Sequence, residues 1–162
     1  MGISADALIA ELRSALGAEA VSADAAVLSS HGVDGVTPSL LVMPESAAQI
    51  ASALAICSAA RASVIPWGGG TAVTVGNPPR QADVVLKLER LNRLIEHDAA
   101  NLTVTIQSGM ALGALQSTLA GQKQFVPIDA PFPSRATVGG IVAANLNGPR
   151  RGYYGSARDL VI

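Results

Sequence analysis

The sequence is poor in the residues that mark several classes of protein. It contains one cysteine, two histidines, one tryptophan, two tyrosines and two phenylalanines among 162 residues. The lone Cys57 excludes an internal disulfide, and no cysteine or histidine stands at metal-ligand spacing, so we expect no metal site. The aromatic residues are too few to form a stacking platform for nucleic-acid bases.

Charge and long apolar runs are scarce as well. Charged residues make up 14% of the chain, and the net charge is -1. No cluster of lysine and arginine is present to bind a phosphate backbone, which argues against a nucleic-acid partner. No apolar run approaches the ~20 residues of a membrane span. Residues 1–6 lack a basic region followed by an apolar run, so we expect no signal peptide and a cytoplasmic location.

The few reactive side chains give no catalytic pattern. Cys57 lies in an alanine-rich run that is typical of a buried helix face. His31 and His97 are far apart, and we expect each to be a surface residue or a hydrogen-bonded structural residue. Since no Ser/His/Asp or Cys/His set is visible, the catalytic residues stay unassigned.

Nearly half of the residues are apolar, which is enough for one ordinary domain or two small lobes. Ser4 is predicted to cap a helix that ends at Gly17, with leucines at helical spacing between them. A second, short helix is predicted over 23–29. Strands are predicted over 40–43, 63–66 and 83–88, with a helix from a Ser46–Gln49 capping box to residue 60 between the first two. This order of strands and helix predicts a small parallel sheet.

A different pattern begins near residue 91. Segments 92–97 and 102–107 predict an antiparallel hairpin, with Leu102, Val104 and Ile106 on one face. A helix is predicted over 110–120, a short strand at 125–126, a long irregular segment over 127–159 and the start of a strand at 159–162. We therefore expect an α+β fold of two lobes, 1–90 and 91–162. The second lobe would be incomplete, and the chain would be a fragment of a longer protein.

Two glycine-rich segments are the strongest candidates for a binding site. "IPWGGGT" at 65–71 follows a predicted strand, but it lacks the lysine of a Walker A loop, and Val73 replaces the third glycine of a Rossmann fingerprint. Two interpretations stay open: a nest of backbone N–H groups for an anion, or a tight connection between strands. "ATVGGIVAAN" at 136–145 places Thr137–Gly140 at the start of a short helix. Free N–H groups there would favour an anion, unless the glycines serve close packing. Two such loops together indicate one extended ligand with a diphosphate.

The segments "VIPWGGGT...GNPP" and "DVVLKLERLNRLIEHDAANLTVTIQSGMALGALQSTLA" resemble the FAD-linked oxidases of the vanillyl-alcohol oxidase type. "PIDAPFPSRATVGGIVAANLNGPRRGYYGSARDLVI" is more similar to the FAD-binding E subunits of bacterial glycolate oxidases. The resemblance covers 38–162. It implies a PCMH-type FAD-binding domain of two α/β lobes, a small parallel sheet with helices followed by a mainly antiparallel sheet with helices.

The resemblance also implies which residues contact FAD. Residues 67–71 would surround the pyrophosphate, and 76–77 would lie near the adenosine. Pro131, Thr137, Gly139 and Gly140 would approach the pyrophosphate and flavin. The implied cofactor-binding residues are Trp67, Gly68, Gly69, Gly70, Thr71, Gly76, Asn77, Pro131, Thr137, Val138, Gly139, Gly140, Asn145, Gly148, Tyr154, Gly155, Val161 and Ile162. Because the first loop holds no histidine, noncovalent binding is expected. Gly69→Val is expected to block FAD by filling the place of a phosphate.

As function, the resemblance implies oxidation of a small 2-hydroxy acid such as glycolate, with hydride transfer to flavin N5. Electrons would then pass to partner subunits, a second flavin subunit and an iron–sulfur subunit, which would also hold the chain peripherally at the inner membrane. Two alternatives stay open: a nonenzymatic FAD-binding or assembly module, and an FAD-linked oxidase of an aldonolactone or aldehyde. We expect no catalytic base in this chain.

Several side chains near the loops have two possible roles. Trp67 either packs between elements or shields the flavin, and Arg135 either faces an anionic ligand or is a solvated loop residue. Asp129 is expected to cap its own turn. Arg158 and Asp159 are expected to form a local ion pair.

Overall fold

The computed structural model describes residues 4–162, which divide into two compact units. The first unit comprises Met1–Trp67 and Val73–Arg90, and the second comprises Gly68–Ala72 and Leu91–Ile162. The first glycine loop is thus grouped with the second unit, although the residues on both sides of it belong to the first. The N-terminal residues 1–3, on which the expectation of no signal peptide partly rests, lie outside the described part.

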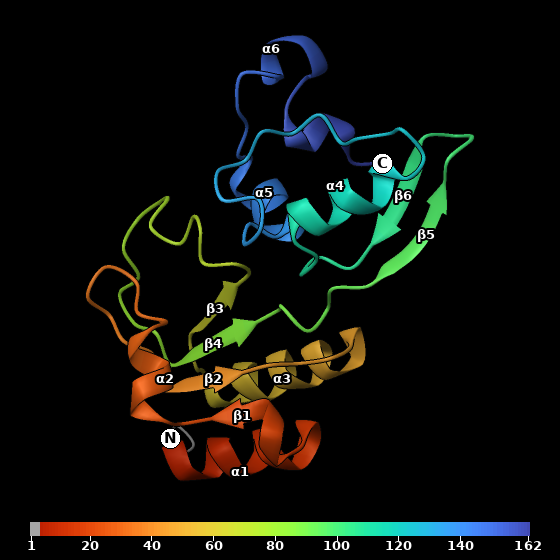
Figure 1. Cartoon of the computed structure of the whole chain (residues 1–162). Coiled ribbons are helices and arrows are strands. Elements are labelled where there is room, and N and C mark those ends of the chain that lie inside the picture. The colour runs from red at the N-terminus through yellow and green to blue at the C-terminus, as the bar shows by residue number, and fades with distance from the viewer. Residues whose placement is uncertain (1–3) are drawn as a thin grey trace. The chain divides into compact units, whose positions relative to one another are not determined.

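The first unit is a four-stranded sheet with helices (Figure 1). Its elements are α1 (Ala5–Leu16), η1 (Ala18–Ala20), β1 (Val21–Ser22), α2 (Ala25–Ser29), β2 (Leu40–Val42), α3 (Ala47–Ala60), β3 (Val64–Trp67) and β4 (Val84–Lys87). The strand order is β1-β2-β4-β3, and β4 runs parallel to both β2 and β3. This confirms the predicted parallel sheet. The sequence did not predict β1, which adds an antiparallel edge strand.

Both faces of this sheet are buried. Alternate residues of β2 and β4, among them Val42 and Val84, pack with α1 and α3, which lie side by side. The residues between them, Leu41 and Val85, pack with Trp67 and Leu28 on the other face. Burial on both faces explains why the strands read as continuous apolar runs rather than alternating ones.

The helices of the first unit begin with side-chain caps. The Ser4 hydroxyl accepts a hydrogen bond from the Ala7 N–H at 3.3 Å, as predicted. The Ser46 hydroxyl accepts from the Gln49 N–H at 3.2 Å, but the Gln49 side-chain oxygen Oε1 accepts from the Glu45 N–H at 2.7 Å rather than from the Ser46 N–H. The predicted capping box is therefore wrong in its second bond, whose donor is the N–H of Glu45 instead of that of Ser46.

The second unit contains a hairpin and helices. Its elements are β5 (Leu94–Asp98), β6 (Thr103–Ile106), α4 (Leu112–Ala120), α5 (Val138–Ala144), α6 (Arg151–Tyr154) and η2 (Ala157–Leu160). The antiparallel pairing of β5 and β6 confirms the predicted hairpin. Leu102 is not on its apolar face. It lies in the turn with a φ of 56° and is 77% exposed, whereas Val104 and Ile106 pack against α4.

Two predicted strands are absent from the described structure of the second unit. Residues 125–126 are irregular because the Gln116 side chain accepts from the Val126 N–H at 3.0 Å and donates to its carbonyl at 2.6 Å. One amide side chain thus replaces a strand partner. The strand predicted at 159–162 is wrong, because η2 ends at Leu160 and residues 161–162 have no regular structure.

The Asp159 side chain caps the start of η2 instead of pairing with Arg158. Its carboxylate accepts from the Ser156 N–H at 2.7 Å and from the Ser156 hydroxyl at 2.9 Å. These bonds lower the pKa of Asp159. Within residues 4–162 no ion pair joins Arg158 to Asp159, so that prediction is wrong.

Candidate functional site

The first glycine loop, Gly68–Ala72, leaves its backbone donors free. Throughout the described chain, none of its five N–H groups donates to a protein acceptor. The five residues are half-buried, and Gly70 has a φ of 68°, which L side chains rarely adopt. Because several neighbouring N–H groups without protein acceptors can donate to one anion, this loop is suited to hold an anionic ligand by its backbone.

The two glycine-rich loops pack directly against each other within the second unit. A Cβ on Gly69 would lie 2.5 Å from the carbonyl carbon of Arg135, and a Cβ on Gly68 would meet the Thr137 side chain. Only glycine permits this approach. The two loops therefore lie together, which a shared diphosphate requires.

This contact also corrects the expectation that Gly69 is required because a side chain there would fill the place of a phosphate. The Cβ of a residue at this position would point at the backbone of Arg135, not into space left for a ligand. Gly69→Val would therefore clash with the second loop. The glycine is required by packing between the loops, whatever the loops bind.

The second loop does not offer the free N–H groups that we expected. α5 covers seven residues, and the donors at its start are all used. The Val138 N–H donates to Met110, the Gly139 N–H to Ser108 and the Gly140 N–H to the Thr137 hydroxyl, at 2.9, 2.8 and 3.3 Å. A Cβ on Gly139 would lie 2.7 Å from the Ser108 carbonyl oxygen. The second loop is thus a rigid support for the first, joined to the segment that precedes α4.

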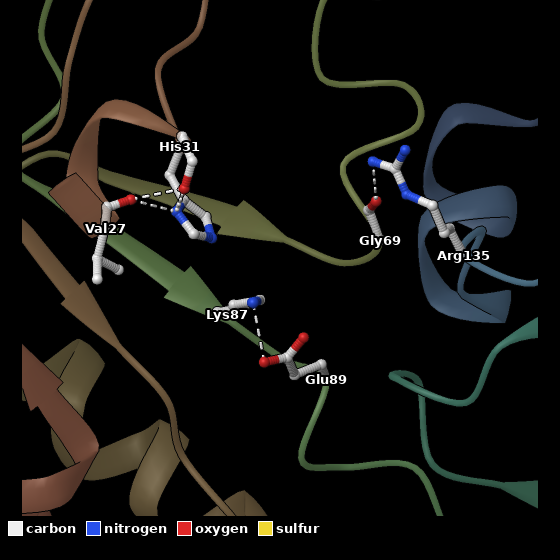
Figure 2. A network of polar contacts seen from close by, with 7 residues as sticks. Val27, His31, Gly69, Lys87, Glu89 and Arg135 are labelled. Carbon is white, nitrogen blue, oxygen red and sulfur yellow. Dashed lines mark hydrogen bonds and ion pairs between the residues drawn. The ribbon is translucent and has the colours of Figure 1, made fainter.

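Arg135 connects the two loops through its side chain. Its Nη2 donates to the Gly69 carbonyl oxygen at 3.3 Å, as Figure 2 shows. The side chain is exposed but bonded, so it is not simply a solvated loop residue. Neither spacing nor residue type in the sequence indicated this bond, because it joins positions that are 66 residues apart.

Other predicted cofactor residues of the second unit have structural roles of their own. Asn145 ends α5 with a φ of 49°, and Gly155 ends α6 with a φ of 87°. A Cβ on Gly148 would lie 2.7 Å from the Asp129 carbonyl oxygen. The remaining exposed members of the predicted set are Pro131, Tyr154, Val161 and Ile162.

Asp129 does not cap its own turn as expected. Its carboxylate accepts from the Arg150 N–H at 3.2 Å and pairs with the Arg150 Nε at 3.2 Å. It therefore holds the segment before α6, 21 residues further along the chain.

Three predicted residues belong to the first unit. Trp67 is 8% exposed, and its ring centroid lies 5.0 Å from that of His31, which favours packing over shielding of a flavin. The His31 Nδ1 lies 2.9 Å from the Val27 carbonyl oxygen, as Figure 2 shows, which confirms a structural role for His31. Gly76 has a φ of 126°, and Asn77 is exposed.

Several groups outside the loops were singled out in the sequence, and the structure shows their surroundings. Residues 4–162 contain no group of three or more His, Cys, Asp or Glu side chains that could hold a metal ion. Cys57 is buried, as predicted, and burial, with the negative charge of Asp83, raises the pKa of its thiol. His97 is hydrogen-bonded to Gln124 at 2.8 Å, as expected for a structural residue. In the described chain no helix is long and apolar enough to cross a membrane.

Comparison with known proteins gives a consistent picture. A family model described as "FAD binding domain" matches residues 38–162. The glycolate oxidase subunit GlcD of Bacillus subtilis is 32% identical over 125 residues, which are 77% of this chain and 27% of that protein. A D-2-hydroxyglutarate dehydrogenase of Xanthomonas citri pv. viticola is 29% identical over 161 residues, 96% of this chain and 34% of that protein.

The fold has counterparts among solved structures. An alkyldihydroxyacetonephosphate synthase aligns over 99% of this chain and 32% of its own, with a TM-score of 0.85 and 20% identity. This likeness shows the fold. The chain spans about a quarter to a third of the length of the curated relatives described above.

Proposed function

Because the chain belongs to the FAD binding domain family, we propose that it binds FAD noncovalently through the first glycine loop, with the second loop as its support. The observation that carries the proposal is the run of five N–H groups in the half-buried residues Gly68–Ala72, none of which has a protein acceptor among the described residues. A diphosphate supplies several acceptor oxygens for such a run. The family match over residues 38–162 confirms the resemblance that the sequence carried, at the level of the family.

The residues present fit the cofactor. Small residues allow the chain to approach an extended dinucleotide, and the loop closes with the hydroxyl residue Thr71 rather than with a histidine that could tether the flavin. The other residues predicted to contact FAD, from Trp67 to Ile162, keep that assignment as part of the proposal. FAD supplies the redox chemistry when it is bound, and the protein supplies position and electrostatics.

We further propose that the whole protein oxidises a small 2-hydroxy acid such as glycolate. The names of the two relatives support this class, since one is a glycolate oxidase subunit and the other a D-2-hydroxyglutarate dehydrogenase. The same proposal has three further parts. The protein acts as the E subunit of such an oxidase, and its electrons pass to a second flavin subunit and an iron–sulfur subunit. It is located in the cytoplasm and is attached peripherally to the inner membrane.

A second candidate is an FAD-binding or assembly module without catalysis of its own. It is supported by the name of one relative, a glycolate oxidase subunit, since a subunit can bind FAD without completing a catalytic site by itself. The two candidates agree on FAD and differ on substrate.

Two measurements test the proposal. The purified chain should show the absorbance bands of a flavin, or should quench the fluorescence of added FAD with a saturable dependence. A colourless chain that leaves FAD fluorescence unchanged would contradict FAD binding. For the substrate, a protein extended beyond Ile162 should lose its flavin absorbance when glycolate is added without oxygen. FAD binding without bleaching by any 2-hydroxy acid would favour the module.

A further inference from the structure

We propose that Arg135 is a positioning residue that sets the direction of the Gly69–Gly70 peptide and thereby presents the Gly70 N–H to a diphosphate. The inference rests on the proposed function for the identity of the ligand. The orientation of the peptide itself rests on contacts within the second unit.

The first step is the bond between Arg135 and the first loop. The guanidinium Nη2 donates to the Gly69 carbonyl oxygen at 3.3 Å, and Figure 2 shows the side chain reaching toward that oxygen. The main chain of Arg135 is in contact with Gly69 as well, because its carbonyl carbon lies 2.5 Å from where a Cβ of Gly69 would be. The side chain of Arg135 is thus bonded to Gly69, and its main chain packs closely against the same residue.

The second step concerns the geometry of the peptide unit. No described peptide bond is cis. In a trans peptide the carbonyl of one residue and the N–H of the next point to opposite sides. When Arg135 holds the Gly69 carbonyl, the Gly70 N–H must point away from the guanidinium. It thus faces away from Arg135, where it has no protein acceptor within the described chain.

The third step is that the loop has little else to fix this peptide. Gly70 has a φ of 68°, and its neighbour Gly69 also lacks a side chain, so a flip of the intervening peptide meets a low steric barrier. A hydrogen bond to a charged donor is stronger than one between neutral groups. The arginine therefore selects one of two peptide orientations, and it places a positive charge behind an anion-binding loop.

The test combines a measurement on the flavin-free chain with a binding titration. In Arg135→Ala the amide resonances of Gly69 and Gly70 should shift and broaden in a ¹⁵N–¹H spectrum without FAD. The affinity for FAD should fall roughly tenfold, the low end of the range for a hydrogen bond to a charged group. Arg135→Lys should partly restore the Gly69 and Gly70 resonances and the affinity for FAD, because an ammonium group can also donate to the Gly69 carbonyl.

Arg93→Ala is the matched control. Arg93 is an arginine of the same unit that bonds to Gln107 in the hairpin. Its loss should change neither the Gly70 resonance nor the FAD affinity. An equal loss of FAD affinity in Arg135→Ala and Arg93→Ala would overturn the inference, since it would show that only the loss of a positive charge matters.

The two proposals can fail separately. Unchanged Gly69 and Gly70 resonances in Arg135→Ala would overturn the positioning role, whether or not FAD binds. A wild-type chain that does not quench FAD, but whose Gly70 amide responds to Arg135→Ala, would contradict the proposed function and support the orientation of the peptide.

Discussion

At the scale of single residues, the glycines of the two loops are required mainly by contacts within the protein. Gly68 faces Thr137, Gly69 faces Arg135, and Gly139 faces Ser108. In each case a Cβ would overlap the opposite segment. A substitution should therefore disturb the packing of the loops before it disturbs any ligand.

The first prediction concerns Gly69. Gly69→Ala should lower the free energy of unfolding by about 1–3 kcal/mol, the range for overpacking a closely packed site, and it should weaken FAD binding at the same time. Chemical denaturation and FAD fluorescence measure the two effects. Gly152→Ala is the control, because a Cβ on Gly152, in α6, would have no neighbour within 4 Å. Equal stability of the two variants would contradict the contact between the loops.

The second prediction uses the only tryptophan of the sequence as a reporter. His31→Ala should open space beside Trp67, whose ring centroid lies 5.0 Å from that of His31. The emission of Trp67 should shift to longer wavelength because water gains access to the indole. His97→Ala removes the other histidine, in the second unit, and should leave the emission unchanged. An unshifted spectrum in His31→Ala would show that His31 does not shield the indole from water.

At the scale of elements, side chains replace regular backbone pairing at several points. Gln116 bonds to both backbone groups of Val126, where a strand was expected. Asp83 links β3 and β4, since its carboxylate accepts from the Ser63 N–H at 2.7 Å and from the Ser63 hydroxyl at 2.8 Å. These two residues are therefore the best places to test individual elements.

The third prediction concerns Gln116. Gln116→Leu should lower the free energy of unfolding by about 1–3 kcal/mol, since it leaves the N–H of the half-buried Val126 without a partner, whereas the Val126 carbonyl still accepts from the Ile128 N–H. Thermal or urea denaturation measures the loss. Gln122→Leu, at an exposed position shortly after α4, should change stability much less. If both variants lose the same free energy of unfolding, the hydrogen bonds between Gln116 and Val126 do not contribute specifically to stability.

The fourth prediction is a pH dependence. Burial raises the pKa of Asp83, but hydrogen bonds from Gln81 and Ser63 outweigh it, and the net pKa is lowered. A carboxylate with a lowered folded pKa stabilises the protein above its unfolded pKa of about 3.9. This contribution is lost as pH falls through the folded pKa. Asp83→Asn should therefore destabilise the chain at neutral pH and flatten the acid limb of its stability curve.

Denaturation of wild type and Asp83→Asn between neutral and acidic pH checks this sign. Glu11→Gln, which removes an exposed carboxylate of α1, is the control for loss of charge. The assignment of the acid limb to Asp83 would be wrong if the two variants had parallel curves.

At the scale of the whole molecule, ligand binding should be visible as stability. If FAD binds the folded state and not the unfolded state, the melting temperature of the chain should rise with FAD concentration. The gain at a hundredfold excess over Kd is about 2.7 kcal/mol. Riboflavin, which lacks the diphosphate, should give a smaller rise at equal concentration. A melting temperature independent of FAD would refute the fifth prediction.

Much of the fold was predictable because it depends on local patterns. The apolar runs of β2 and β4, the caps at Ser4 and Ser46, and the alternation in β6 each follow from a few neighbouring residues. Two errors share one cause. Val126 and Asp129 bond to residues that lie 10 and 21 positions away, respectively, and that short-range patterns do not identify, so they were assigned to a strand and a turn. Asp159 is a different error, because its partner Ser156 is only three residues away, in a capping box that was not predicted from the sequence.

The candidate site divides in the same way. The sequence located both glycine loops and supported the family, which the match over residues 38–162 confirms. It did not indicate that the N–H groups at the start of α5 are used by Met110, Ser108 and Thr137. For the first loop it left two interpretations open, a nest of free N–H groups or a tight connection between strands, and the structure shows no protein acceptor for those groups among the described residues. The assignment of the remaining contact residues stays a prediction.

By itself, the sequence determined the parallel sheet, the hairpin, the positions of both glycine loops and the family, because apolar periodicity, caps and motifs are local properties of the chain. Only the tertiary structure decided what each glycine faces and which donors remain available. Those facts depend on which backbone atoms come within a few ångströms of each other, and Gly69 and Arg135 are 66 positions apart before the chain folds.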